Sequence, residues 1–297
     1  MTVYEVSALG QTYTRPAIRE LFSLLRRHKL AMLGLFIILG LAIVAIFAPL
    51  IAPHDPTVQN LSLRLMSPSW EYPMGTDSVG RCVLSRLIYG TRVSLQVGVT
   101  VVLITSVTGT ALGLIAGYFS GIVDEIIMRI VDILLSFPGL ILALVVVGVL
   151  GPGLQNVLLA LSVVGWMQYA RVVRGVAMSA KEKDFVTAAR ALGASNRYIL
   201  LRHIMPEALP HVIVLATLNA GGVILAAAAL SFLGLGIEPP TPEWGAMLNT
   251  GRAYIYNAPH LTIFPGVAIM LTVLAFNFLG DGLRDALDPK QKSGLGI

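Results

Sequence analysis

Uncharged, strongly apolar segments recur along the chain, and shorter segments that carry the charges separate them. A helix needs about 20 mostly apolar residues to cross a bilayer, and only helices and closed barrels satisfy their own backbone hydrogen bonds in lipid. One segment of 38 residues is too long for a single helix, and Gly151-Pro152-Gly153 interrupts it, which indicates a hairpin of two spans. Six spans are therefore predicted from five apolar segments: residues 30–53, 93–123, 133–170, 212–237 and 261–280.

The positive charges of the connecting segments predict the orientation of these spans. With the N-terminus inside, the cytoplasmic segments hold 16 Lys and Arg residues and the outer segments hold 5. Cytoplasmic loops of membrane proteins carry the excess of Lys and Arg, so both termini are predicted to be cytoplasmic. Arg171 and Arg174, which follow the fourth span, are expected to contact lipid headgroups.

The spans divide the chain into segments, and the predicted fold class is all-α, a polytopic membrane protein with six transmembrane helices. The first span follows a polar segment of 29 residues and is too long for the apolar part of a signal peptide, so we expect it to be retained. The segments are a cytoplasmic N-terminus (1–29), a first span (30–53), an extracytoplasmic loop (54–92), a five-helix core (93–281) with a cytoplasmic loop (181–210), and a cytoplasmic tail (282–297).

The composition agrees with a chain that lies mostly in lipid. It is 56% hydrophobic and 12% charged, whereas a soluble domain has about 25% charged residues. The net charge of +5 is spread between the apolar segments, so the lipid bilayer is an expected partner and nucleic acid is not. The single cysteine, Cys82, excludes a disulfide framework, and the five histidines lack metal-ligand spacing, so no metal site is expected.

The connection between the fourth and fifth spans has the pattern of two short helices. Phe185, Ala188, Ala189 and Leu192 recur at helical spacing and predict one apolar stripe on the first helix, which Gly193 is placed to end. Such a helix suits docking in a groove of a partner protein. A basic loop lying on lipid headgroups explains the pattern equally well.

The second helix of this connection is predicted to begin at Asn196, after Ser195 as its N-cap, and to end at Pro206. Polar side chains at membrane depth are costly and tend to face a water-filled path or another helix. Hydrogen bonding between helices is the alternative to a place on a transport pathway for each of the four candidates, which are Gln168, Tyr169, Asn219 and Asn277.

Several motifs of energy-coupling and catalytic proteins are absent from the sequence. It contains no GxxxxGK[ST] phosphate loop, no HExxH and no GxSxG, and no charged pair lies inside a predicted span. We therefore expect no catalytic residue, and the energy for any transport must come from another subunit.

The connection resembles the cytoplasmic "EAA" loop of bacterial ABC importer permeases, whose short coupling helix docks on the ATP-binding subunit. The match covers Ala188, Ala189, Gly193, Ile204 and Pro206, and a threonine stands where the motif has its glutamate. The resemblance assigns ATPase coupling to Phe185, Thr187, Ala188, Ala189, Leu192, Gly193, Ile204 and Pro206.

Three further segments are similar to one branch of these permeases, the dipeptide, oligopeptide and nickel permeases. GTDSVGRCVLSR (75–86) is similar to the signature GTDxxGRDxxSR, with Cys82 where Asp is usual. The second segment combines LSFLGLG (230–236) with PEWGAML (242–248). The third is GDGLRDALDP (280–289). In the first of these segments, 75–86, Asp77 is placed to act as the N-cap of a helix. Arg81 and Arg86 of the same segment are placed to pair with carboxylates in a structural cap on the outer face.

The resemblance implies a first span followed by a five-helix, MetI-like transport core that works by alternating access in the inner membrane. It implies four kinds of partner: a homologous second permease, two ATP-binding subunits that bind ATP and Mg²⁺, an extracytoplasmic solute-binding protein and the bilayer. This chain would hold no cofactor. The substrate would be a short peptide or a nickel complex, and Cys82 and the segment 166–171 are closer to the nickel-importing members. The alternative function is a stand-alone channel or secondary carrier, which would leave the docking-shaped loop unexplained.

Overall fold

The computed structural model describes residues 4–6, 12–14, 24–26 and 28–287. Apart from one antiparallel hairpin, β1 (Tyr4–Val6) with β2 (Thr12–Thr14), the regular structure in these residues is helical, which confirms the predicted all-α class. The helical elements are α2 (Lys29–Ile46), α3 (Ala48–Ile51), η1 (Leu61–Leu63), α4 (Val83–Phe119), α5 (Gly121–Leu135), α6 (Gly139–Leu150), α7 (Leu154–Lys181), α8 (Asp184–Ala191), α9 (Asn196–Ile199), the π-helical η2 (Leu200–Ile204), α10 (Met205–Phe232), α11 (Trp244–Gly251), η3 (Arg252–Tyr254) and α12 (His260–Leu287).

Five helical segments are long and apolar enough to cross a membrane: α2, α4, α7, the continuous segment from α9 to α10, and α12. The pair α5 and α6 passes the same test together but is bent by 89°. The prediction of six spans is confirmed when this pair is counted as one broken span. Most of the predicted N-terminal segment 1–29, and residues 288–297 of the predicted tail, lie outside the described residues.

The charges of the spanning helices lie toward their ends. Arg86 and Arg92 are in the first turns of α4, and Arg171, Arg174 and Lys181 are in the second half of α7. At 1.5 Å per residue, the 37 residues of α4 extend for roughly 55 Å, well beyond the hydrocarbon thickness of about 30 Å. Arg86, roughly 22 Å from the middle of α4, therefore lies outside the hydrocarbon core when the middle of the helix crosses it, and Arg92 lies near the edge of that core.

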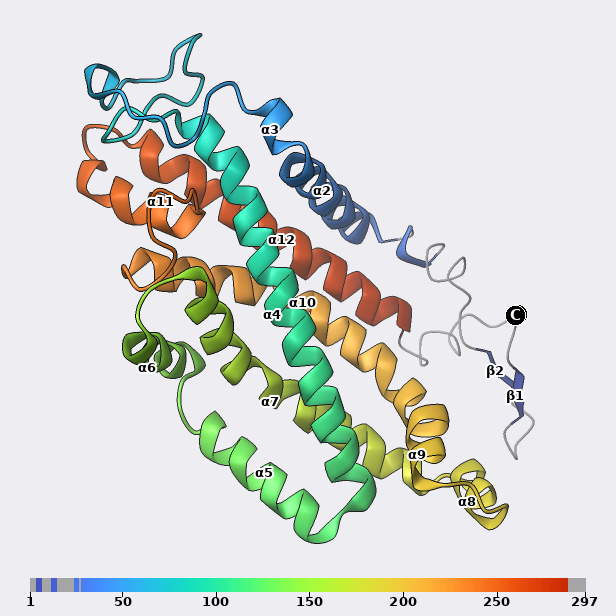
Figure 1. The fold of residues 1–297 in the computed structure, drawn as a ribbon. Helices are drawn as coiled ribbons and strands as arrows, with labels where there is room; N and C mark the ends of the chain where they lie inside the picture. Colours follow the sequence, from blue (N-terminus) through green and yellow to red (C-terminus); the bar gives the residue numbers. More distant parts are fainter. Residues whose placement is uncertain (1–3, 7–11, 15–23, 27, 288–297) are drawn as a thin grey trace.

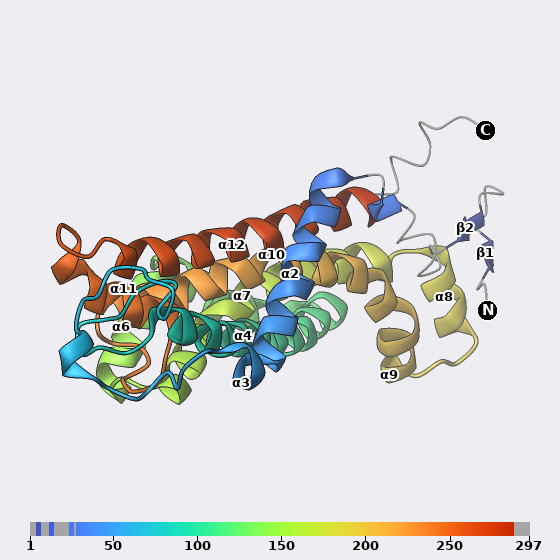
Figure 2. The ribbon, with the colours of Figure 1, turned by 90° about the horizontal axis from the view of Figure 1, so that it is seen from above.

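The bundle is built around α4, which packs along α7 and α10 and also contacts α2 and α5. Helix α12 packs against α10 and α2, and α6 packs against α7. In both ribbon views, α11 lies at one end of the elongated molecule and α8 and α9 lie at the other (Figures 1 and 2). We call the end formed by residues 52–82 and 233–259 the cap. The opposite end, formed by residues 182–204, is called the coupling loop after the role that the sequence resemblance predicts for it.

Two helix boundaries depart from the prediction at the cap. Helix α4 begins at Val83 rather than at residue 93, so the segment predicted as the loop 54–92 ends in helix. Arg86 does not keep the start of this helix in solvent, because it is buried in the cap and paired there. Helix α10 ends at Phe232, before the predicted end of the fifth span at residue 237.

The third span also departs from the prediction, because it is broken rather than straight. Helix α5 ends at Leu135, and α6 begins at Gly139 after a break that contains Pro138. Proline disfavours helical backbone at the residue before it, which explains a break at this place. The turn between the third and fourth spans does fall at residues 151–153, where the two glycines have positive φ.

Candidate functional site

One face of α8 packs on the chain's own membrane helices. Only two residues separate α8 from the end of α7 at Lys181. Val186 is completely buried, and Phe185 and Ala189 are half-buried against the same core. The Phe185 ring also lies 5.8 Å from the ring of His203. Helix α8 is therefore held to the bundle along this side.

The opposite face of α8 is exposed and carries small side chains. Thr187 and Ala188 are exposed on it, and Leu192, just past the helix, is 88% exposed. The prediction that the four stripe residues share one contact face is wrong. Burial of Val186 turns the helix so that Phe185 and Ala189 face the bundle, while the other two stripe residues face outward.

The turn between the two short helices follows the sequence prediction. Gly193 has a φ of 82°, a left-handed conformation that glycine adopts without steric cost. The Ser195 hydroxyl caps α9 by accepting a hydrogen bond from the backbone N–H of Tyr198 at 3.3 Å. Pro206 does not end the second helix, because the chain continues from α9 through η2 into α10. It stands at the start of α10, directly after the π-helical turn η2, where the regular α-helical hydrogen-bond pattern is already interrupted.

The coupling loop is fastened to three membrane helices. Ile204 is completely buried in a cluster shared by α4, α7, α8 and α10. The hydroxyl of Tyr118, at the end of α4, donates a hydrogen bond to Asn196 Oδ1 at 2.8 Å. Lys183 pairs with Glu207 of α10 at 2.7 Å. These contacts join the coupling loop to the ends of α4, α7 and α10.

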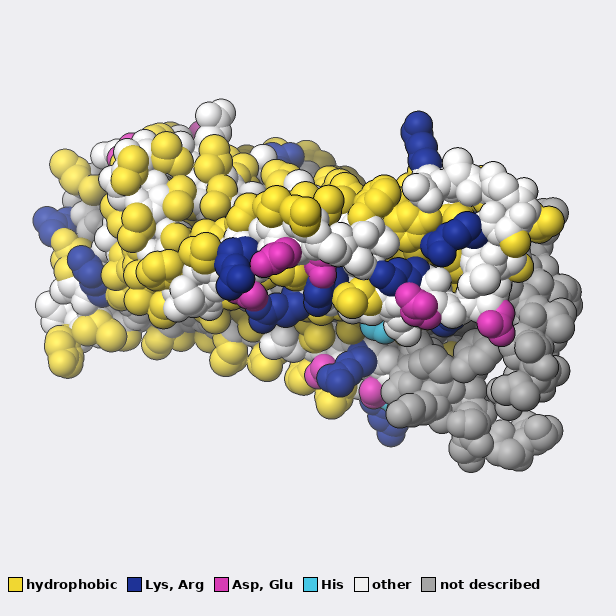
Figure 3. Space-filling view, turned by 90° about the horizontal axis from the view of Figure 1, so that it is seen from below, with side chains coloured by type: hydrophobic (Ala, Val, Ile, Leu, Met, Phe, Trp, Pro, Cys, Tyr) yellow, Lys and Arg dark blue, Asp and Glu magenta, His cyan; other side chains and the backbone are white. Residues whose placement is uncertain are grey.

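Acidic and basic side chains gather on one face of the otherwise largely hydrophobic surface (Figure 3). Ion pairs join α5 to α7: Arg171 contacts Asp132 at 2.6 Å, and Arg174 makes a two-pronged pair with Asp124. The prediction that both arginines contact lipid headgroups did not foresee these protein partners. The sequence displayed the two aspartates, but nothing in it indicated that α5 would lie beside α7.

The four polar candidates for the pathway have different surroundings. Gln168 is exposed on α7, and its side-chain oxygen accepts a hydrogen bond from Asn219 of α10 at 3.3 Å. Tyr169 is only 1% exposed and lies in the core cluster behind them. Asn277 is half-buried on α12, outside this pair. The structure thus brings two of the four together and turns Tyr169 away from the surface.

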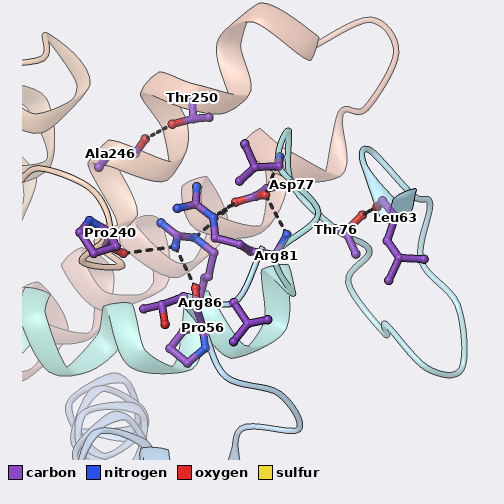
Figure 4. A network of polar contacts seen from close by, with 12 residues as sticks. Pro56, Leu63, Thr76, Asp77, Arg81, Arg86, Pro240, Ala246 and Thr250 are labelled. Atoms are coloured by element: carbon purple, nitrogen blue, oxygen red, sulfur yellow. Dashed lines mark hydrogen bonds and ion pairs between the residues drawn. The ribbon is translucent and has the colours of Figure 1, made fainter. Parts of the chain in front are cut away.

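Three charged side chains are buried together in the cap (Figure 4). Asp77 Oδ2 lies 2.7 Å from Arg81 Nε and 3.6 Å from Arg86 Nε. Arg86 also donates through Nη1 to the carbonyl oxygens of Pro56 at 3.0 Å and Pro240 at 3.4 Å. The predicted pairing of the two arginines with a carboxylate is confirmed. Arg86 ties the first turn of α4 to both loops of the cap.

Asp77 does not cap α4, contrary to prediction. Its Oδ1 accepts hydrogen bonds from the backbone N–H groups of Val79 and Arg81, both at 3.0 Å, and so closes its own turn. The N-cap of α4 is Cys82, whose side chain makes no capping hydrogen bond. The start of α4 is held instead by the loop that precedes it.

The segment PEWG fixes α11 against the membrane helices. Both carboxylate oxygens of Glu243 accept hydrogen bonds from α11, from the N–H of Gly245 at 2.9 Å and that of Ala246 at 2.8 Å. Burial raises the pKa of Glu243, although these N–H groups favour its charged form. Trp244 is 1% exposed, and its Nε1 donates to the carbonyl oxygen of Leu87 at 3.1 Å.

Two families match this chain. Residues 109–293 match the binding-protein-dependent transport system inner membrane component, and residues 18–68 match the N-terminal TM domain of oligopeptide transport permease C. The chain therefore belongs to the family of binding-protein-dependent transport system inner membrane components. It is a multi-pass, non-catalytic permease subunit of an ABC importer, a class that works with ATPase subunits and a binding protein.

Curated relatives match nearly the whole chain. The dipeptide transport system permease protein DppC of Alkalihalophilus pseudofirmus is 50% identical over 93% of this chain and 90% of its own length. The glutathione transport system permease protein GsiD of Pectobacterium atrosepticum is 48% identical over 91% of this chain and 89% of its own length. The resemblance stated from the sequence motifs is confirmed.

A solved structure shares the fold. An inward-facing structure of the MetNI methionine ABC transporter matches with a TM-score of 0.55 at 22% identity, over 68% of this chain and 96% of that one. At this identity the match supports the fold alone, and it confirms the predicted MetI-like core.

Proposed function

We propose that this chain is one of two homologous permease subunits that together form the translocation pathway of a short-peptide importer. In this proposal two ATP-binding subunits bind ATP and Mg²⁺ and supply the energy, and this chain holds no cofactor. A solute-binding protein delivers substrate at the cap, which faces outside. Both termini lie in the cytoplasm, in keeping with the 16-to-5 distribution of Lys and Arg.

Peptides are favoured as the substrate over a nickel complex. The relatives that are 50% and 48% identical are named for dipeptide and glutathione transport, and both molecules are short peptides. Cys82 is 2% exposed in the cap, so it is not placed to bind a passing metal complex. Uptake of labelled dipeptide, glutathione and nickel by the complete transporter would distinguish the three.

The exposed face of α8 is the observation that carries the coupling role. It presents small side chains beside Leu192, which is 88% exposed, at the end of the molecule opposite the cap (Figure 2). Small residues permit close approach of a partner, and an exposed leucine provides an apolar anchor. The attachment of the loop to α4, α7 and α10 would carry movement of an ATPase into the membrane helices.

The hydrogen-bonded pair Gln168–Asn219 is proposed to line the pathway. Gln168 is exposed at the surface of this chain, at a depth where lipid or the second permease must cover it. Facing an amide to lipid is costly, so the surface of α7 and α10 that carries this pair would face the shared pathway. Asn277 and Tyr169 have no place in this surface.

Co-purification of the permease pair with its tagged ATPases tests the coupling role. Ala188→Glu would bury an unpaired charge in the docking contact, which typically costs about 3–5 kcal/mol, so we expect the affinity for the ATPase to fall about 100- to 5,000-fold and its recovery to be lost. Ala188→Ser keeps the side chain small and should leave recovery unchanged. Equal recovery with both variants would contradict docking through this face.

Reconstituted vesicles separate this proposal from a stand-alone carrier. Vesicles that contain the permease pair, both ATPases and the binding protein should take up peptide only when ATP is present on the side of the membrane where the ATPases are bound. Uptake by this chain in vesicles without ATPases would overturn the importer role and favour the carrier.

A further inference from the structure

The cap buries one more positive charge than it pairs. Asp77, Arg81 and Arg86 are 6%, 6% and 4% exposed. Among the described residues, Asp77 is the one carboxylate within 4 Å of either guanidinium, which leaves a net charge of 2 − 1 = +1. Glu243 is also a buried carboxylate of the cap, but it makes no ion pair within 4 Å with either guanidinium, and its oxygens accept hydrogen bonds from the N–H groups of α11. A buried charge without a partner is strongly unfavourable.

The backbone does not neutralise this surplus. The carbonyl oxygens of Pro56 and Pro240 accept hydrogen bonds from Arg86 but carry no net charge. The N-terminus of α4 contributes about +0.5 charge nearby, and the C-terminus of α11 contributes about −0.5 at most, so these two effects roughly cancel. The surplus positive charge therefore favours the binding of an anion at this place.

A small cavity lies beside the three side chains. Its volume is about 20 Å³, enough for one water-sized sphere or a monatomic ion and far too little for a peptide. Thr250 borders the cavity and is exposed, so the cavity is reached from solution on the cap side. Its lining residues are Asp77, Arg81, Val83, Arg86, Met247, Thr250, Gly251 and Leu261.

Free donors are available in this cavity. A guanidinium has five N–H groups. Among the described residues, the Arg81 side chain donates through Nε alone, and Arg86 donates through Nη1. The remaining nitrogens of Arg81 lie on the side that faces α11 (Figure 4). The Thr250 hydroxyl is not a free donor, because it donates to the carbonyl oxygen of Ala246 at 3.0 Å.

We propose that this cavity binds a small inorganic anion of the size of chloride, held by the guanidinium groups of Arg81 and Arg86. The anion supplies the missing negative charge, and so stabilises the junction of the cap loop, α4 and α11. The site is structural and distinct from the peptide pathway. This inference does not depend on the proposed substrate or coupling role.

The sequence offers an independent reason for the surplus. In the signature that residues 75–86 resemble, an acidic residue stands where this chain has Cys82. Cys82 follows Arg81 directly, is 2% exposed and is the uncapped N-cap of α4. Asp77 is therefore the one carboxylate in residues 75–86, the segment that holds both arginines.

Thermal unfolding of the full chain, purified with its partner subunits, tests the proposal. At constant ionic strength, chloride is compared with gluconate, which is too large for the cavity. With chloride at ten times its dissociation constant, we expect the Tm of the wild type to rise by on the order of 3 °C. Arg81→Gln should abolish this rise. Arg64→Gln, which removes an exposed arginine of the same cap, should retain it.

Arg81→Gln could prevent assembly, so Thr250→Leu provides a second variant that leaves the ion pairs intact and fills the cavity from its rim. It should also abolish the chloride-dependent rise. A structure determined in bromide should show anomalous scattering in the cavity. Equal Tm values in chloride and gluconate, a chloride response that survives Thr250→Leu, or water alone in the cavity in bromide would each overturn the proposal.

Discussion

Close packing of α4 on α7 predicts a large effect from adding a single methyl group. Gly109, Gly113 and Gly117 recur every four residues on α4 and face α7. Small residues at this spacing let two membrane helices approach closely. A Cβ at Gly113 would lie 2.6 Å from the carbonyl oxygen of Ala170 and 2.9 Å from Val173 Cβ.

The structure sets the size of the effect of Gly113→Ala. Ordinary contacts of a Cβ begin at 3.4 Å, so the helices must separate by about 3.4 − 2.6 = 0.8 Å. The closest atom belongs to the backbone of α7, so no side-chain rotation relieves the clash. Overpacking of this kind costs about 1–3 kcal/mol. Replacing glycine by alanine in a helix also stabilises the helix by up to about 1 kcal/mol through its higher helix propensity. The control must therefore be another Gly→Ala substitution in a helix, so that this gain cancels in the comparison.

Gly175→Ala is the matched control, because it lies on α7 with nothing within 4 Å of its added Cβ. We expect the free energy of unfolding of the purified complex, from denaturant titration, to be lower for Gly113→Ala than for Gly175→Ala by about 1–3 kcal/mol. Equal stability of the two variants would refute the described packing of α4 on α7.

Three further predictions concern orientation, the coupling loop and the cap. In a Cys82→Ser background, Tyr256→Cys should react with an impermeant thiol reagent in intact cells and Thr187→Cys only after permeabilisation; the reverse pattern would invert the topology. Gly193 has a φ of 82° with open space around it, so Gly193→Val should abolish substrate-stimulated ATPase activity through backbone strain alone, whereas Gly193→Asn should retain part of it; equal activity would contradict this turn. Burial raises the pKa of Glu243, so the stability that its neutral form supports should be lost as pH rises from about 4.5 through the raised pKa. The Tm of the wild type should fall over this range, and Glu243→Gln should flatten the fall. Parallel profiles of Tm against pH for the two proteins would contradict this role of Glu243.

The sequence by itself determined the membrane class, the six spans and the turns. These features depend on local properties: the length of uncharged segments, a glycine at a left-handed position such as Gly193, and a hydroxyl placed as an N-cap at Ser195. The pairing of the cap arginines with a carboxylate was also foreseen, since buried guanidinium groups require one. The signature motifs identified the family for the same reason, because each is contiguous along the chain.

Only the tertiary structure decided which residues face one another. Val186 turns α8 so that Ala188 faces outward, and this depends on a cluster drawn from four separate helices. Arg171 and Arg174 looked like lipid anchors until α5 was placed beside α7. The spacing of Gly113 and its neighbours is visible in the sequence, but what a Cβ there would strike is not. Helical periodicity fixes the angle between residues on one helix, whereas the direction of each face depends on the packing of all the helices together.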